Sequence, residues 1–142
     1  MKLLLDTGVL GQVCHPRKYS DVRAWALRAA LAHDILVPEV ADYELRRELI
    51  RIGAHRSLDH LNELERELRY VPISTAIWHH AAQLWAMQRR RGRPTANHAS
   101  LDCDVLLAAQ ALAEGGTVIT FNTRHFTGVV EALTWQQVPM VD

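Results

Sequence analysis

Three short apolar runs, separated by segments with helical periodicity, most narrowly limit what this chain can fold into. The runs are KLLL (2–5), ILV (35–37) and TVITF (117–121), and polar or turn-forming residues bound each of them. Runs of this length and composition predict buried strands. Strands that alternate with helices predict an α/β fold, in which helices cover both faces of a mainly parallel central sheet.

The segments between these runs carry the predicted helices, which are assigned from N-cap residues, apolar spacing and terminal glycines. Helices are predicted from Ser20 onward, from Pro38 to about Gly53, from Ser57 to about Arg69, from Ser74 to Gly92, and over 103–114. We expect Asp6-Thr-Gly to form a turn, 70–73 to be a brief strand or loop, 93–100 to be a loop, and 134–141 to hold a last short strand. Apolar spacing predicts two core-facing stripes, one of Ala41, Leu45, Leu49 and Ile52 and one of Ile77, Ala81, Leu84 and Trp85.

Length and composition exclude several classes of protein. The 142 residues suit one domain, 1–142, and 49% apolar with 23% charged residues is a globular composition. No apolar run is long enough to cross a membrane, and the N-terminus lacks the pattern of a signal peptide. Cys14 and Cys103 form no CxxC pair, so a disulfide framework is not expected. These features predict a cytoplasmic protein.

The basic residues are mostly arginine, which is the side chain suited to bidentate contacts with phosphate. Net charge is zero, yet 14 of the 16 basic residues are arginine. They cluster at Arg46 and Arg47 and again at 89–93, where Arg89, Arg90, Arg91 and Arg93 surround one glycine. A charged run at a helix end is also an ordinary solvated face that suits the helix dipole. Both interpretations stay open from the sequence.

Carboxylates gather where the predicted strands end. Asp6 follows the first strand, Asn122 follows the last, and the helix after the second strand carries Glu44 and Glu48. Asp102 and Asp104 stand at the expected start of a buried helix in LDCDVLLAAQALAEGG (101–116). In open α/β sheets ligands bind at the carboxyl ends of the strands. Crowded carboxylates need a cation, so this edge of the sheet predicts a Mg²⁺ or Mn²⁺ site.

Each of these residues also has a purely structural interpretation. Asp6 suits a turn, Asp102 a helix N-cap and Asp104 the positive end of a helix dipole, and Asn122 could be an ordinary loop residue. Helical spacing alone does not decide between Glu44 and Glu48 as the acid that faces the edge.

Four segments, LLLDTGVL, ADYELRREL, LDCDVLLAAQALAEGG and VITFNTRHF, resemble in order the signature segments of PIN-domain ribonucleases, in particular the toxins of VapBC-type toxin–antitoxin systems. The resemblance spans essentially the whole chain and implies a PIN-like three-layer fold. It implies Asp6, Glu44 and Asp104 as catalytic acids and metal ligands. The family's fourth position falls on Asn122, with Thr120 as the nearby hydroxyl, and Asp102 is an additional acid at the same edge.

The same resemblance implies a function and partners. It implies a Mg²⁺- or Mn²⁺-dependent endoribonuclease that cleaves single-stranded RNA segments, with the arginines at 46, 47, 89–91 and 93 as candidate RNA contacts. An antitoxin segment is expected to cover the acidic edge or the groove leading to it. A homodimer is expected through the helix from Ser74, where Trp78 lies off the core stripe and Trp85 and Met87 add apolar surface. The alternative is an inactive PIN-like interaction module, which the asparagine at 122 favours.

Overall fold

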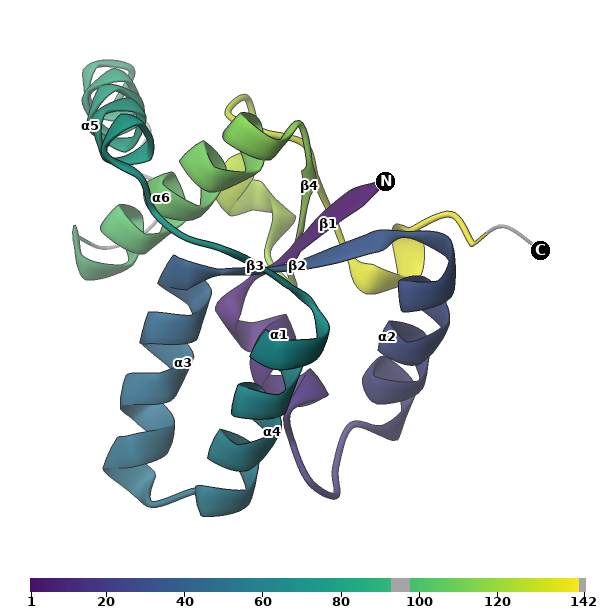
Figure 1. Cartoon of the computed structure of the whole chain (residues 1–142). Coiled ribbons are helices and arrows are strands. Elements are labelled where there is room, and N and C mark those ends of the chain that lie inside the picture. The colour runs from purple at the N-terminus through teal and green to yellow at the C-terminus, as the bar shows by residue number, and fades with distance from the viewer. Residues whose placement is uncertain (93–97, 141–142) are drawn as a thin grey trace.

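The computed structural model describes residues 1–92 and 98–140, and of residues 98–101 it describes only the backbone. Strands and helices alternate along the chain (Figure 1). The elements are β1 (Lys2–Leu5), α1 (Thr7–Val13), α2 (Ser20–Ala32), β2 (Asp34–Pro38), α3 (Glu39–Ile52), α4 (His55–Glu67), β3 (Arg69–Val71), α5 (Thr75–Arg90), α6 (His98–Glu114), β4 (Thr117–Ile119), the 3₁₀ turn η1 (Thr123–Phe126), β5 (Ala132–Leu133) and the 3₁₀ turn η2 (Trp135–Gln137).

A parallel five-stranded sheet in the order β3-β2-β1-β4-β5 forms the centre of the fold. β1 lies between β2 and β4, with Leu4 opposite Leu36 on one side and Val118 on the other. All four neighbouring strand pairs are parallel, so their carboxyl ends meet at one edge. This confirms the α/β fold with a parallel sheet that the apolar runs predict.

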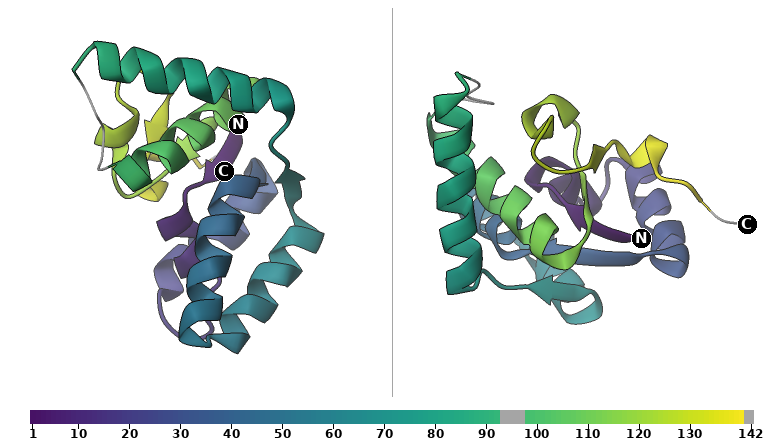
Figure 2. Two further views of the ribbon diagram at one scale, coloured as in Figure 1. Left: turned by 90° about the vertical axis from the view of Figure 1, so that its left-hand side faces the viewer. Right: turned by 90° about the horizontal axis from the view of Figure 1, so that it is seen from above.

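The apolar core has two halves, one on each face of the sheet. Leu3 and Leu5 of β1 point to a face covered by α1, α2, α3 and α4, whereas Leu4 points to a face covered by α5 and α6. Side chains alternate between faces because the strand period is two residues. Figure 2 shows α5 and α6 packed together on their side of the sheet, away from α3 and α4. The layers are therefore helix, sheet and helix, as the resemblance implies.

α1 is the element that the sequence analysis misses, since Asp-Thr-Gly was expected to form a turn. Asp6 instead caps a seven-residue helix, and its Oδ1 accepts a hydrogen bond from the backbone N–H of Thr7. The two glycines of TGVLGQV weaken any helical signal. Burial of Val9 and Leu10 in the core stabilises the helix despite this weak propensity.

α6 begins at His98, so the expectations of a loop through residue 100 and of a helix start at 103 are both wrong. The segment 98–100 contains neither glycine nor proline, and nothing in its backbone prevents the helix from extending. Residues 93–97 of the expected loop lie outside the described part of the chain. Asp102 and Asp104 consequently lie inside the helix, and Asp102 is not its N-cap.

Smaller differences concern the edges of elements. β4 ends at Ile119 rather than 121, and the last strand, β5, lies just before the segment 134–141 where that strand was expected, while η2 forms near the start of that segment. α2 is capped by Tyr19 rather than Ser20, and α4 begins at His55 rather than Ser57. Within the described residues, no helix has both the length and the apolar character needed to cross a membrane.

Two core stripes also differ from expectation at their ends. Ile52 of α3 and Trp85 of α5 are exposed, while Val40 and Gln88 are buried. An apolar stripe drifts around a helix because 3.6 residues complete a turn, so the last predicted member of each stripe points away from the sheet.

Candidate active site

Asp6 lies at the carboxyl end of β1, where both of its oxygen atoms are held. The backbone N–H of Thr7 donates to Oδ1 (2.8 Å), and the hydroxyl of Thr120 donates to Oδ2 (2.7 Å). Burial raises the pKa of this carboxyl, the two hydrogen bonds oppose that rise, and the charge of Glu44 adds to it. The carboxylate is therefore fixed in orientation but only partly compensated in charge.

Glu44 reaches the same place from α3. Its Oε1 accepts a hydrogen bond from the hydroxyl of Thr7 (2.7 Å), so one threonine donates to both Asp6 and Glu44. Glu48, one turn further along α3, is exposed and pairs with Arg51. The geometry thus brings Glu44, and not Glu48, next to Asp6.

Asp104 approaches the two other carboxylates from α6. Burial raises its pKa to about 7, and the negative charges of Asp6 and Glu44 add to this effect. Its Oδ2 is buried and makes no hydrogen bond within the described structure. We call Asp6, Glu44 and Asp104 the carboxylate cluster. It brings together three acids from three separate parts of the chain. The positive charge and hydrogen bonds that the described residues place around them are too few to stabilise all three in the ionised form.

His125 is the site residue that the sequence analysis missed. Its Nδ1 lies 3.1 Å from Oδ2 of Asp104, although the angle is not that of a hydrogen bond, and its Nε2 lies 2.8 Å from Nδ2 of Asn122. Asn122 also donates its backbone N–H to Thr120 (3.1 Å). The turn η1 thus brings Asn122 and His125 to the cluster. The only feature of the sequence that indicates a role for His125 is its place three residues after Asn122, within one turn.

Cys103 also borders the cluster from α6. Burial and the adjacent charge of Glu44 raise the pKa of its thiol to about 12, and its side chain hydrogen-bonds that carboxylate. The thiol therefore stays protonated and donates to Glu44 at neutral pH.

Asp102 does not join the carboxylate cluster, contrary to expectation. It lines a hollow between α5 and α6, beside Trp78 and Trp85. Residues two positions apart on a helix differ in direction by about 200°. Asp102 and Asp104 therefore face opposite ways once both lie inside α6. Its expected place at the edge of the sheet required the helix to begin later than it does.

Arg46 is engaged away from the carboxylate cluster, which removes it from the candidate RNA contacts. Its guanidinium binds Asp42 of its own helix and Asn62 and Glu65 of α4. It therefore joins α3 to α4.

The other candidate arginines have different surroundings. Arg47 is exposed on α3, with its guanidinium 5.0 Å from the centre of the Tyr43 ring, and its charge acts on Glu44 and Cys103 near the cluster. Arg89 lies over the ring of Trp85 at 4.7 Å, at the end of α5 that Arg90 and Arg91 continue. Arg93 lies outside the described residues.

The donor atoms at the cluster suit a hard divalent cation. Carboxylate oxygens are the preferred ligands of Mg²⁺ and Mn²⁺, and the buried Oδ2 of Asp104 has no hydrogen-bond donor. Over residues 1–92 and 98–140, no three His, Cys, Asp or Glu side chains are arranged so that they could already hold a metal ion. The hydrogen bond from Thr7 uses only Oε1 of Glu44, so Oε2 remains able to become a ligand. The chemistry fits a cation, and the side chains need to move to surround it.

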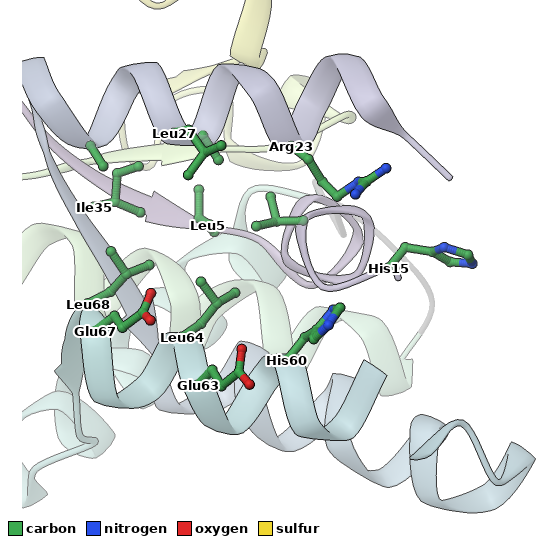
Figure 3. A pocket seen from close by; sticks show the side chains of 13 residues that line it. Leu5, His15, Arg23, Leu27, Ile35, His60, Glu63, Leu64, Glu67 and Leu68 are labelled. Atoms are coloured by element: carbon green, nitrogen blue, oxygen red, sulfur yellow. The ribbon is translucent and has the colours of Figure 1, made fainter. Parts of the chain in front are cut away.

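A second hollow, of about 340 Å³, lies between α2 and α4 (Figure 3). Leu27 of α2 points across it toward Leu64 of α4 and toward Leu68, which directly follows α4, and Leu5 lies between the two helices. Leu27 is 75% exposed although it is apolar. We call this the α2–α4 groove. Because Leu5 immediately precedes Asp6, the groove lies next to the strand end that carries the cluster.

Sequence and structural comparisons agree on the fold. The sequence model of the PIN domain matches residues 3–130. No curated protein matches the sequence.

Solved structures of toxin–antitoxin complexes resemble the chain closely in fold. VapBC2 from Rickettsia felis bound to a promoter DNA fragment has a TM-score of 0.78 at 17% identity, covering 95% of this chain and 99% of that one. DNA-bound VapBC from Salmonella typhimurium has a TM-score of 0.75 at 21% identity, with coverage of 95% and 98%. FitAcB from Neisseria gonorrhoeae has a TM-score of 0.73 at 22% identity, with coverage of 96% and 99%.

Removing one charge from the cluster should stabilise the metal-free protein at high pH. The pKa of Asp104 is higher in the folded protein, about 7, than its ordinary value of 3.8, so the folded state binds the proton more tightly. The contribution of Asp104 to the free energy of unfolding is therefore greatest below about pH 4, where the carboxyl is protonated in both states. This contribution is lost as the pH rises toward 7. In EDTA, Asp104→Asn should unfold at a higher temperature than the parent at pH 8 and lose most of that advantage at pH 5.

Thermal unfolding of both proteins at the two pH values checks this expectation. Asp59→Asn, which changes an exposed acid on α4, is the matched control and should not alter the pH dependence. An Asp104→Asn protein that is less stable than the parent at pH 8 would show that the carboxylates do not repel one another.

Proposed function

The chain belongs to the PIN domain family, and we propose that it is a metal-dependent endoribonuclease that acts as the toxin of a toxin–antitoxin pair. The observation that carries the proposal is the carboxylate cluster, in which three half-buried acids, one directly after β1, one on α3 and one on α6, meet with incomplete charge compensation. Natural proteins rarely bury such charges without a function that uses them. The fold shared with VapBC complexes supports the toxin assignment.

Asp6, Asp104 and Glu44 would hold the cation, which is Mg²⁺ or Mn²⁺. When bound, such a cation neutralises the carboxylates, stabilises charge on the scissile phosphate and lowers the pKa of a nearby water. Thr7 and Thr120 keep the oxygens of Asp6 pointed toward the cluster. Glu44 or Asp104 accepts the proton of the attacking water.

The proposed substrate is a single-stranded segment of RNA, because its backbone and bases are reachable at an open edge of a sheet. A surface carrying three carboxylates repels phosphate, so cationic side chains nearby must favour the bound backbone. Arg47 is the arginine whose charge acts on the cluster, and it is exposed. We therefore assign the backbone contact to Arg47 first.

Cleavage of an unstructured RNA in the presence of Mg²⁺ or Mn²⁺ tests the function, and EDTA should suppress it. Glu44→Gln should reduce the rate by at least about a hundredfold while leaving the protein folded, because it removes a ligand charge and a base. Glu48→Gln is the matched control on the same helix and should cleave like the parent.

Two results would contradict this proposal in different ways. Cleavage that persists in EDTA would reject the metal mechanism. A folded protein that cleaves no RNA with either metal would instead favour an inactive PIN-like interaction module, for which the exposed Asn122 in place of an acid is the supporting observation.

The hollow between α5 and α6 supports the proposal of a homodimer. Trp78 is 53% exposed there and lies beside Trp85, Val105 and Leu106 in a predominantly apolar surface. Exposed tryptophans that lie together on a surface commonly mark a protein contact. A second copy of the chain is the proposed occupant, since two identical apolar hollows can cover one another across a two-fold axis.

Light scattering at micromolar concentration should give about twice the 16.1 kDa mass of the chain. Trp78→Glu should return the mass to that of one chain, because a charge would be buried at the interface. Ile50→Glu, at an exposed apolar position on α3, is the control and should stay dimeric. A monomeric parent would reject the dimer and leave the nuclease proposal unaffected.

The α2–α4 groove is the proposed docking site of the antitoxin. It presents opposed leucines to solvent, and Figure 3 shows Arg23 on one side of it and Glu63 and Glu67 on the other. An amphipathic segment of a partner protein fits such a surface, with apolar side chains between the helices and charged ones at the margins. None of the residues of the carboxylate cluster lines the groove, so a partner segment has to continue beyond the groove to cover the cluster.

Leu27→Asp should abolish co-purification with the product of a short adjacent gene, because it places a charge inside the groove. The protein alone should fold and cleave RNA as before, since Leu27 is mostly exposed. Leu112→Asp, at a less exposed apolar position on α6, serves as the control. Retention of the partner by Leu27→Asp would place the antitoxin elsewhere.

A further inference from the structure

The two phenylalanines of the chain have opposite surroundings. Phe126 is 1% exposed and belongs to the core beneath η1. Phe121 is 48% exposed and lies directly after β4, at the carboxyl edge of the sheet. Leaving half of a phenylalanine in water forgoes part of the roughly 2 kcal/mol that full burial contributes. The exposed part of this ring is therefore available to a ligand at this edge.

Phe121 is held next to the carboxylate cluster by its neighbours in the chain. Thr120 donates its hydroxyl to Asp6, and the backbone N–H of Asn122 donates to the same Thr120 oxygen. The backbone of Phe121 is thus fixed between two hydrogen bonds that both lead to Asp6. The position of the ring is consequently tied to that of the first carboxylate.

The ring lies against the first turn of α1. A Cβ placed on Gly8 would be only 3.3 Å from Cδ2 and 3.6 Å from Cε2 of the ring, which is tight for any side chain. Glycine at this position lets the ring approach the helix that Asp6 caps. Among the described residues, no aromatic or cationic group stacks on Phe121.

An aromatic ring beside a cluster of carboxylates can attract a nucleic acid, which the carboxylates themselves cannot do. The acids repel the phosphates of a nucleic acid, but every base has an apolar face that stacks on an aromatic ring. Phe121 has no polar group, so it contributes by stacking without selecting a base by hydrogen bonds. Stacking also requires unpaired bases, which excludes a regular duplex.

We propose that Phe121 is a stacking platform for a nucleobase of single-stranded RNA next to the phosphate that is cleaved. The proposal rests on the nuclease function argued above and adds the residue that holds the base. A protein partner could also cover an exposed apolar side chain, but it would accept leucine there, whereas base stacking needs the flat face of a ring.

Binding is measured in the Asp104→Asn background with Mg²⁺, so that RNA is not cut. The probe is a short single-stranded RNA that carries 2-aminopurine, whose fluorescence is quenched on stacking. Phe121→Leu keeps the apolar contact with Gly8 and removes the ring, and Phe121→Tyr keeps the ring. Tyr19→Leu, which removes an exposed ring at the start of α2, is the matched control.

The platform predicts that Phe121→Leu binds RNA about tenfold more weakly and loses the quenching. Phe121→Tyr and Tyr19→Leu should bind within about twofold of the parent. Equal affinity and quenching in Phe121→Leu would overturn the platform, as would a Phe121→Leu defect confined to antitoxin binding. If the unsubstituted protein cleaves RNA and Phe121→Leu is equally active, only the stacking proposal is rejected. If the unsubstituted protein neither binds nor cleaves RNA, the nuclease proposal is rejected as well.

Discussion

The parallel pairing of β1 between β2 and β4 is the constraint on which the site depends. Asp6 follows β1, α3 starts at the end of β2, and Thr120 follows β4, so the pairing alone brings Asp6, Glu44 and Thr120 together. The backbone N–H of Asp6 donates to Ile119, which extends the β1–β4 pairing to the site itself. An antiparallel arrangement would send these three groups to opposite edges. The function therefore follows from strand direction more than from any single residue.

Because this arrangement brings carboxylates close together, they repel one another, and hydrogen bonds from two threonines reduce the effect of that repulsion. Thr7 donates to Asp6 and Glu44, and Thr120 donates to Asp6, whereas the buried oxygen of Asp104 has no donor among the described residues. Each hydrogen bond to a carboxylate stabilises its charged form by roughly 1.5–3 kcal/mol. Burial and the charges of Asp6 and Glu44 raise the pKa of Asp104 to about 7, and among the described residues no hydrogen bond to its buried oxygen opposes that rise. The unmet demand for positive charge is concentrated on the carboxylate that α6 contributes.

The sequence was sufficient to predict the layers of the fold, because strands and amphipathic helices have periods that can be read along the chain, whereas the assignment of Asp6, Glu44 and Asp104 as the acids of the site came from the family resemblance. α1 was missed because its stability comes from burial of Val9 and Leu10 and not from propensity. Asp102 was misplaced because the direction of a helical side chain depends on where the helix begins, which a segment without a strong cap does not reveal. Glu44 could be separated from Glu48 only by family resemblance, since the partner that distinguishes them is the hydroxyl of Thr7 on another element.

The three proposed functional surfaces occupy different parts of the molecule, which makes their simultaneous use sterically feasible. The α2–α4 groove belongs to one face of the sheet and the hollow between α5 and α6 to the other, and the sheet lies between them. The carboxylate cluster lies at the edge where the two faces meet. A dimer formed through α5 and α6 therefore leaves the groove open in each copy. A partner in the groove therefore lies on the face of the sheet opposite the dimer surface and does not compete for it.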